Sequence, residues 1–140
     1  MGIPPKHPSK DYGYISAYPQ DAKIKSVQNF IEKPDLEKSK SLIKNPNVYW
    51  NAGIFVWKSA VILAALEQHE PAIHQIFSAQ PEVYGSSQEI AFLQAAFATC
   101  PDISIDFAVM EKAKNVSMVL ADFDWSDLGT WGSLTTHLHK

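Results

Sequence analysis

Arginine is absent from this sequence: all 12 basic residues among its 140 are lysines, and with 15 acidic residues the formal net charge is −3. Arginine supplies the planar guanidinium that binds phosphate and carboxylate groups through two hydrogen bonds. Nucleic-acid-binding proteins depend on dense basic patches, so a slightly acidic chain without arginine argues against nucleic acid as a partner. A phosphate bound here would be held by lysine, backbone N–H groups, a metal ion or residues from elsewhere.

Cysteine and long apolar runs are also scarce. Cys100 is the one cysteine, so the chain cannot form an internal disulfide. A lone thiol excludes a disulfide scaffold and is typical of a reducing compartment. The apolar run at residues 60–66 is too short to cross a membrane, and the first residues lack the layout of a secretory leader. We therefore expect a cytoplasmic protein with no membrane partner.

Several local signatures of chemistry are missing as well. The sequence has no glycine-rich phosphate loop, no zinc-ligand spacing among its 5 histidines, and neither a Ser–His–Asp order nor an HExxH pattern. What it does have is 46% hydrophobic and 19% charged residues, which are values of an ordinary globular chain. A chain of this length usually forms one domain with a real core.

Strand and helix signals alternate along the sequence. Two aromatic and β-branched segments flank a turn at residues 19–23 and predict a β-hairpin, and Asp35 is a predicted N-cap. Strands are expected at residues 12–18, 24–32, 48–58 and 116–123. Helices are expected at residues 36–44, after a cap at Ser59, after Pro71, and at 86–99, 105–113 and 127–139. This order predicts an α/β fold in which helices flank a mixed sheet.

The two later strands are far apart in the sequence and need other strands beside them, because sheets usually have several strands. The pattern therefore indicates part of a larger sheet. An open strand edge is a template for pairing with another chain, which predicts a homo-oligomer.

Polar residues follow the second predicted strand, and ligands of open α/β sheets gather at the carboxyl ends of strands. Glu32 and Lys33 lie at and just past the end of this strand, and Pro34 fixes the bend after them. A lysine held at such a corner can direct its ammonium at a phosphate. The alternative is a solvated charge beside Glu32.

Asn51 and Gly53 lie in an aromatic-rich segment. The asparagine amide offers one acceptor and two donors on a short stem, which suits hydrogen bonding to sugar hydroxyls. Gly53 allows a ligand or a neighbouring backbone to come close. The alternative is a strand bulge that contains a satisfied core amide.

Two aspartates occupy positions near expected helix starts. Asp127 lies beyond the last predicted strand, where a carboxylate can bind Mg²⁺ or act as a helix N-cap. Asp106 stands at another expected helix start, where capping and interaction with the helix dipole explain an aspartate.

Taken together, several segments resemble the mannose-1-phosphate guanylyltransferase family, also called GDP-mannose pyrophosphorylases. The resemblance covers nearly the whole chain and rests on the order and spacing of the segments. They are YGYI at residues 12–15, FIEKP at 30–34, WNAGIF at 50–55, SIDFAVMEK at 104–112 and WSDLGTW at 125–131. The resemblance implies part of a Rossmann-like nucleotidyltransferase domain of the GT-A type.

The family transfers a nucleotide to a sugar phosphate. A phosphate oxygen of mannose 1-phosphate attacks the α-phosphorus of GTP, and pyrophosphate leaves, a reaction that depends on placement and charge neutralisation. The resemblance implies that Gly13, Glu32 and Asn51 hold the mannose, with Gly53 in the same substrate-binding segment. It implies that Lys33 is a catalytic residue that binds the sugar phosphate.

The aspartates also have implied roles. By its matching position, Asp127 is a catalytic residue and one of two carboxylates that hold the Mg²⁺ cofactor. Asp106 is implied in substrate binding or in organising the site.

The sequence also departs from the family pattern. The family opens with a glycine-rich loop bearing arginine and lysine, then a guanine pocket and the first metal-binding aspartate, and none of these is present here. We therefore expect residues 1–140 to be the second, sugar-phosphate-binding half of the catalytic domain. The nucleotide-binding half, through which GTP would bind, is expected to be absent, and the chain is expected to be inactive alone. The alternatives are a non-catalytic sugar-phosphate-binding or assembly module, and half of a nucleotidyltransferase for another sugar 1-phosphate, such as glucose 1-phosphate.

Overall fold

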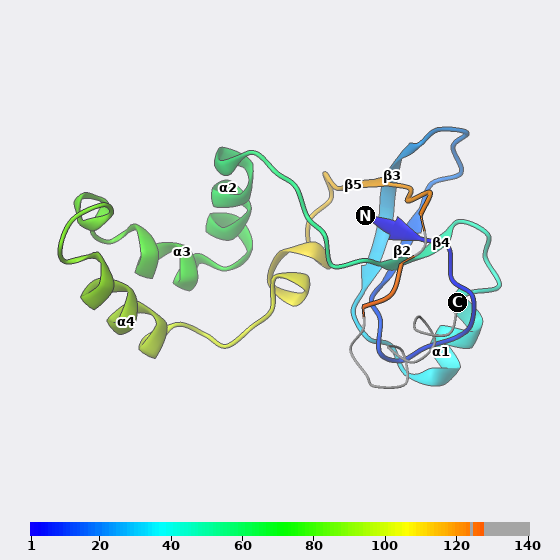
Figure 1. Cartoon of the computed structure of the whole chain (residues 1–140), viewed down its shortest axis with the longest axis horizontal. Helices are drawn as coiled ribbons and strands as arrows, with labels where there is room; N and C mark the ends of the chain where they lie inside the picture. The colour runs from blue at the N-terminus through cyan, green and yellow to red at the C-terminus, as the bar shows by residue number, and fades with distance from the viewer. Residues whose placement is uncertain (124, 128–140) are drawn as a thin grey trace. The chain divides into compact units, whose positions relative to one another are not determined.

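The computed structural model describes residues 1–123 and 125–127 and divides the chain into two compact units (Figure 1). We call Met1–Phe55 with Asn115–Lys140 the sheet unit, and Val56–Lys114 the helical unit. This division is finer than the one domain expected from the chain length.

The sheet unit is built on a five-stranded sheet with the order β1-β4-β2-β3-β5. Its strands are β1 (Gly2–Ile3), β2 (Tyr14–Ala17), β3 (Ile24–Ile31), β4 (Val48–Asn51) and β5 (Ser117–Val119). The ladders between these strands are antiparallel, and a parallel bridge joins Gly2 to Leu120, just after β5. The bridge connects the two edges, so the sheet curls and leaves less open edge than the sequence predicts. The predicted α/β fold is confirmed.

The predicted hairpin is confirmed: β2 pairs with β3, and Tyr14 lies opposite Ile31. Tyr14 is fully buried, and its Oη donates to the Ser9 carbonyl at 2.8 Å and accepts from the Ser9 N–H at 2.9 Å. These hydrogen bonds fasten the proline-rich loop before β2 to the core. The buried core cluster of this unit consists of Ile3, Tyr14, Val48, Trp50 and Ala121.

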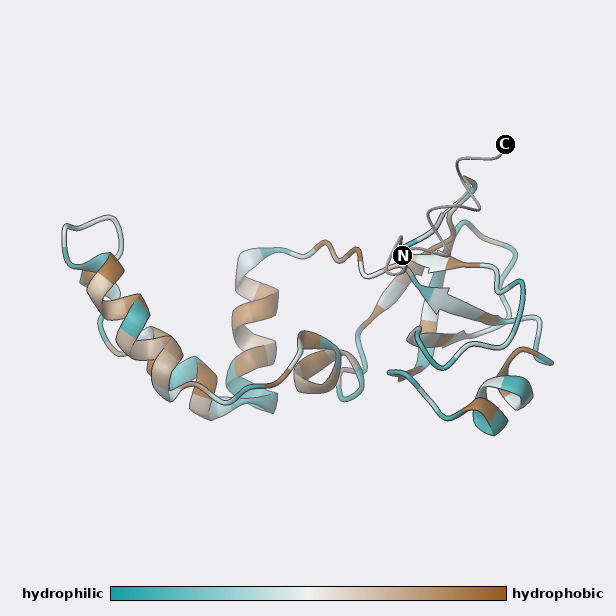
Figure 2. Ribbon diagram, turned by 60° about the horizontal axis from the view of Figure 1, so that its bottom comes forward, coloured by the Kyte–Doolittle hydropathy of each residue, from teal (hydrophilic) through white to brown (hydrophobic). Residues whose placement is uncertain are grey.

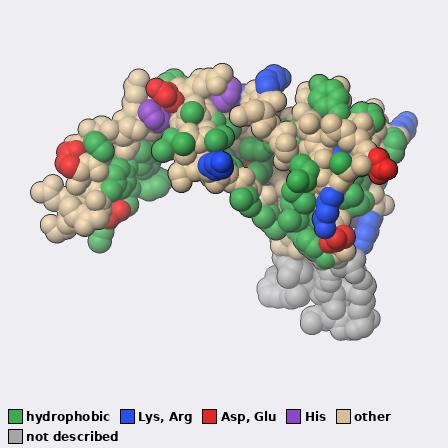
Figure 3. All heavy atoms as spheres, turned by 90° about the horizontal axis from the view of Figure 1, so that it is seen from above, with side chains coloured by type: hydrophobic (Ala, Val, Ile, Leu, Met, Phe, Trp, Pro, Cys, Tyr) green, Lys and Arg blue, Asp and Glu red, His purple; other side chains and the backbone are tan. Residues whose placement is uncertain are grey.

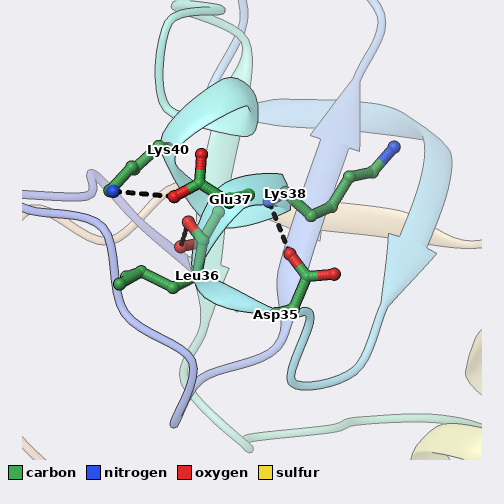
Figure 4. Close-up of polar contacts among 6 residues, drawn as sticks. Asp35, Leu36, Glu37, Lys38 and Lys40 are labelled. Carbon is green, nitrogen blue, oxygen red and sulfur yellow. Dashed lines mark hydrogen bonds and ion pairs between the residues drawn. The ribbon is translucent and has the colours of Figure 1, made fainter.

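Helix α1 (Leu36–Leu42) begins where the sequence predicts. The Asp35 carboxylate accepts a hydrogen bond from the Lys38 N–H at 2.7 Å, as an N-cap should (Figure 4). Ser39 is fully buried, and its hydroxyl donates to the Leu36 carbonyl at 2.8 Å. The predicted cap is confirmed, and the helix ends at Leu42 instead of residue 44.

All four predicted strands are longer than the observed ones, and the last two differ most. The strand expected at residues 48–58 ends at Asn51, whose side chain accepts from the Gly53 N–H, and Gly53 turns the backbone with φ +70°. The strand expected at 116–123 ends at Val119. The Leu120 N–H still donates to the Lys23 carbonyl in the register of the β3–β5 ladder, but the Ala121 N–H donates to the Gly2 carbonyl instead.

The helical unit contains α2 (Ser59–His69), α3 (Pro71–Ser78), the 3₁₀ turn η1 (Pro81–Val83), α4 (Glu89–Thr99) and the short helix η2 (Asp106–Met110). The helices predicted after Ser59, after Pro71 and within 86–99 are confirmed. Ser59 is the first helical residue and not the cap, which is Lys58 without a side-chain bond. Hydrophobic residues colour these helices brown in Figure 2 and gather on the exposed surface of the unit in Figure 3.

The helix predicted at residues 105–113 was wrong in its length and type. The structure has a five-residue π-helix there, in which the Glu111 N–H donates to the Asp106 carbonyl at 3.0 Å. Burial of Ala108, Val109 and Met110 fixes this short segment, and π geometry persists for about one turn. The helix predicted at 127–139 lies, after its first residue, outside the described residues. Within residues 1–123 and 125–127, no helix is long and apolar enough to span a membrane.

Candidate functional site

The register of the sheet brings three predicted site residues together. Tyr14 begins β2 and lies between the last residue of β3 on one side and Trp50 of β4 on the other. The residues next to these pairs are Gly13, Glu32 and Asn51. The Asn51 N–H donates to the Gly13 carbonyl at 2.7 Å, which continues the β2–β4 pairing by one residue. The predicted grouping of these residues at strand ends therefore follows from two antiparallel ladders.

A side chain at Gly13 would clash with its neighbours. A Cβ at this position would overlap Oε2 of Glu32 and would lie 3.3 Å from Cβ of Asn51. The Glu32 side chain is only 11% exposed, so its carboxylate is held over the Gly13 backbone and shielded from most of the solvent. Two acceptor oxygens are thereby fixed beside the Asn51 side chain, an arrangement that can bind sugar hydroxyls.

Lys33 holds an ammonium next to this carboxylate. Its Nζ lies 3.5 Å from Oε1 of Glu32, and its side chain is 61% exposed. Among the described residues, Lys33 is the one non-glycine with a positive φ, at 43°. This left-handed conformation costs a non-glycine residue about 1–2 kcal/mol. The backbone therefore holds the lysine in an unfavourable conformation at the predicted corner before Pro34.

Asn51 and Gly53 form a turn at the end of β4. Oδ1 of Asn51 accepts from the Gly53 N–H at 3.1 Å, and Gly53 has a positive φ, where an added Cβ would meet nothing within 4 Å. Asn51 is buried, with 9% of its surface exposed. The structure thus combines the two interpretations of this segment: a turn that the asparagine side chain stabilises, and an open space beside Gly53.

Asp127 lies beside Tyr12, which directly precedes Gly13. The Tyr12 Oη donates to Oδ1 of Asp127 at 3.5 Å, and the Tyr12 ring packs edge-to-face on Trp50 and on Trp125, with centroid distances of 4.8 Å and 5.4 Å. Burial raises the pKa of the Tyr12 phenol, and the negative charge of Asp127 raises this pKa further. Asp127 and the Glu32–Lys33 pair therefore both lie beside residues 12 and 13.

The sequence gives no role to Tyr12, which it places inside a strand. The contact between Tyr12 and Asp127 joins residues 115 positions apart, which no local pattern can predict. The one available signal was the aromatic residue directly before Gly13, together with a second aromatic residue, Trp125, near Asp127.

Asp106 belongs to the helical unit, where it is the first residue of η2. The helix start expected there is confirmed, and a role of Asp106 in substrate binding stays a prediction. Within the described part of the chain, no three His, Cys, Asp or Glu side chains form a group that could hold a metal ion. Asp127 is an exposed carboxylate, and this donor fits Mg²⁺ as a single protein ligand, because Mg²⁺ keeps several waters and substrate oxygens.

The whole sequence, residues 1–140, matches the family described as nucleotidyl transferase. The chain belongs to the nucleotidyl transferase family. It is 42% identical over 138 residues to mannose-1-phosphate guanylyltransferase of Sinorhizobium fredii, in a match covering 96% of this chain. It is 34% identical over 142 residues to mannose-1-phosphate guanylyltransferase of Escherichia coli K12, again over 96% of this chain.

A solved structure supports the same relationship. The crystal structure of mannose-1-phosphate geranyltransferase from Thermus thermophilus superposes with a TM-score of 0.84 at 32% identity, covering 99% of this chain and 39% of that chain. The match spans 27% of the length of the Sinorhizobium relative and 29% of the Escherichia one. This nucleotidyl transferase chain therefore corresponds to part of those proteins, and the family resemblance predicted from its sequence is confirmed.

Proposed function

We propose that this nucleotidyl transferase chain supplies the sugar-phosphate-binding part of a mannose-1-phosphate guanylyltransferase. The observation that carries the proposal is the position of the Glu32 carboxylate, which is held over Gly13 beside Asn51, with the Lys33 ammonium 3.5 Å away. Acceptors for hydroxyl groups and a cation for a phosphate thus lie next to each other, as a sugar phosphate requires. The names of the relatives supply the identity of the sugar.

In the proposed reaction, a phosphate oxygen of mannose 1-phosphate attacks the α-phosphorus of GTP. The bond between the α-phosphorus and the bridging oxygen breaks, and pyrophosphate leaves with that electron pair. Glu32 and Asn51 bind the mannose hydroxyls, and Lys33 binds the sugar phosphate. Lys33 lowers the repulsion between two anionic substrates and aligns the attacking oxygen, which is where enzymes of phosphoryl transfer gain most of their rate.

Asp127 is the proposed protein ligand for Mg²⁺. When bound, the ion neutralises charge on the triphosphate. Asp127 would supply one carboxylate oxygen. Asp106 is proposed to help organise the site. We also propose that the chain forms a homo-oligomer. We place it in the cytoplasm because a lone thiol, Cys100, is typical of a reducing compartment.

We propose further that these residues alone do not turn GTP over. The sequence contains neither arginine nor a glycine-rich phosphate loop, so it lacks the groups that usually bind a triphosphate. GTP is proposed to bind through residues that are not among these 140.

Calorimetric titration of the chain tests the proposal. Mannose 1-phosphate should bind, Lys33→Asn should weaken this binding about tenfold because it removes a charge-assisted hydrogen bond, and GTP alone should not bind. Lys44→Asn, which removes an exposed lysine after α1, is the matched control and should leave the affinity unchanged. Equal affinity of wild type and Lys33→Asn for mannose 1-phosphate would contradict the proposal, and tighter binding of glucose 1-phosphate would reassign the sugar.

A second experiment separates an enzyme part from a non-catalytic module. The chain is mixed with a segment of a relative that carries the glycine-rich phosphate loop, together with GTP, mannose 1-phosphate and Mg²⁺. Release of pyrophosphate that is lost in Lys33→Asn and in Asp127→Asn supports catalysis. Binding of mannose 1-phosphate without any release, when the same segment is active with its own second half, identifies a binding module.

A further inference from the structure

Tyr12 connects the two groups of residues that the proposed function uses. Its backbone directly precedes Gly13, and its Oη lies 3.5 Å from Oδ1 of Asp127. Its ring packs on Trp50 at an interplanar angle of 61° and on Trp125 at 71°. Aromatic contacts therefore hold the Tyr12 ring between Trp50, directly before Asn51, and Trp125, two residues before Asp127, and its hydroxyl contacts the Asp127 carboxylate.

This contact matters because Asp127 is exposed. An exposed carboxylate samples several rotamers, and fixing one of them to bind a cation costs conformational entropy. A hydroxyl that donates to one carboxylate oxygen restricts this motion before any ligand arrives. Groups that orient a ligating carboxylate in this way change metal affinity about 10- to 100-fold when they are removed.

The position of the ring ties this effect to the sugar side of the site. Trp50 is 4% exposed and lies in β4 directly before Asn51, so the surface on which Tyr12 packs is part of the rigid core. Trp125 is two residues before Asp127 and contacts the same ring. One aromatic stack thus places the Asp127 segment next to the strand that carries Asn51.

We propose that Tyr12 is a positioning residue that orients the Asp127 carboxylate toward a divalent cation, an inference that rests on the proposed role of Asp127. Its role is carried by the hydroxyl, and the ring contacts keep the hydroxyl in place. Tyr12→Phe removes the hydroxyl and retains the ring, so this variant separates the proposed role from packing.

The test uses Mn²⁺, which shares the oxygen-ligand preference of Mg²⁺ and broadens NMR signals of nearby amides. In the wild-type chain, Mn²⁺ should broaden the amide signals of residues 125–127. Tyr12→Phe should require about tenfold more Mn²⁺ for the same broadening, and Asp127→Asn should abolish it. Tyr18→Phe, which removes a phenol hydroxyl from a half-exposed residue just after β2, is the matched control and should behave as wild type.

The outcomes distinguish this inference from the proposed function. Equal Mn²⁺ dependence in Tyr12→Phe and wild type overturns the role of Tyr12 and leaves the proposed function intact. If Mn²⁺ does not affect residues 125–127 in the wild type, while mannose 1-phosphate still binds, the metal role of Asp127 is wrong and the inference falls with it.

A second measurement covers the case in which Tyr12→Phe disturbs the ring packing, which the indole signals of Trp50 and Trp125 would reveal. Thermal unfolding of Tyr12→Phe, Asp127→Asn and the double variant then gives the coupling between the two positions. A measurable coupling supports the hydrogen bond, and additive effects overturn it.

Discussion

The carboxylate of Glu32 occupies the space that a side chain at Gly13 would fill. Gly13→Ala should therefore push this carboxylate away from Asn51. Because the displaced group is the far end of a flexible side chain, the variant should lose only about 1 kcal/mol of unfolding free energy, the low end of overpacking costs. Its affinity for mannose 1-phosphate should fall at least about tenfold, because a hydrogen-bonding carboxylate leaves the site. Urea unfolding and calorimetry measure the two effects.

Gly85→Ala is the control for this change. Gly85 also lacks a side chain and has a positive φ, 78°, but a Cβ there meets nothing within 4 Å. The control should lose stability through backbone strain while keeping the wild-type affinity for mannose 1-phosphate. A Gly13→Ala variant that binds as tightly as Gly85→Ala would show that the Glu32 carboxylate is not needed for the sugar.

Replacing Lys33 by glycine should affect stability and ligand binding in different directions. Glycine adopts a positive φ without strain, so Lys33→Gly should relieve about 1–2 kcal/mol and should lose about 0.5–1 kcal/mol through the greater freedom of the unfolded chain. The variant should thus be as stable as wild type or slightly more stable. It should nevertheless bind mannose 1-phosphate about tenfold more weakly, because the ammonium is gone.

Lys44→Gly provides the comparison, since Lys44 is not among the residues with a positive φ. This control has no strain to relieve and should only lose stability in urea unfolding. If Lys33→Gly is destabilised as much as Lys44→Gly, the backbone at residue 33 is not strained, and the structural reason for a special lysine at this corner disappears.

Local sequence patterns predicted the parts of this fold that depend on near neighbours. The hairpin of β2 and β3 follows from a local turn. The Asp35 cap follows from a hydrogen bond to an N–H three residues away. The resemblance also named Gly13, Glu32 and Asn51 as one group. The physical reason for that group was beyond the sequence, because it depends on the register of two separate ladders.

The errors have the same origin. A run of aromatic and β-branched residues predicts a strand at 48–58, but the Asn51 side chain competes for the Gly53 N–H and ends the strand. Helical spacing predicts a helix at 105–113, but burial of three consecutive residues keeps only a short π-helix. The strained backbone of Lys33 is likewise invisible in sequence, because its conformation is imposed by tertiary structure.

The N-cap of α1 gives a prediction about stability alone. Asp35→Ala removes the acceptor of the Lys38 N–H and should cost about 1 kcal/mol, whereas Asp35→Ser should retain most of the stability because serine also caps helices. Neither variant should change the affinity for mannose 1-phosphate by more than about twofold, since Asp35 takes no part in the proposed site. Equal stability of Asp35→Ala and wild type in urea unfolding would mean that the cap is not formed in solution.

An ion pair at the edge of the sheet gives a prediction about pH. The Lys23 ammonium donates to Oδ2 of Asp122 at 2.9 Å, and this hydrogen bond, with the positive charge of Lys23, holds the pKa of the Asp122 carboxyl below its usual value of 3.8. A pKa that is lower in the folded state stabilises the fold above the unfolded pKa, and the contribution disappears as the pH falls below that value.

Asp122→Asn should therefore lower the thermal midpoint slightly near neutral pH, and this effect should shrink as the pH falls below the unfolded value and through the lowered pKa of the folded Asp122 carboxyl. The effect near neutral pH should shrink in about 0.5 M NaCl, because both side chains are exposed and salt screens them. Asp21→Asn removes the same charge from the turn between β2 and β3 and serves as the control for net charge. If both variants show the same pH and salt dependence, the effect comes from net charge, and the Lys23–Asp122 pair contributes nothing of its own.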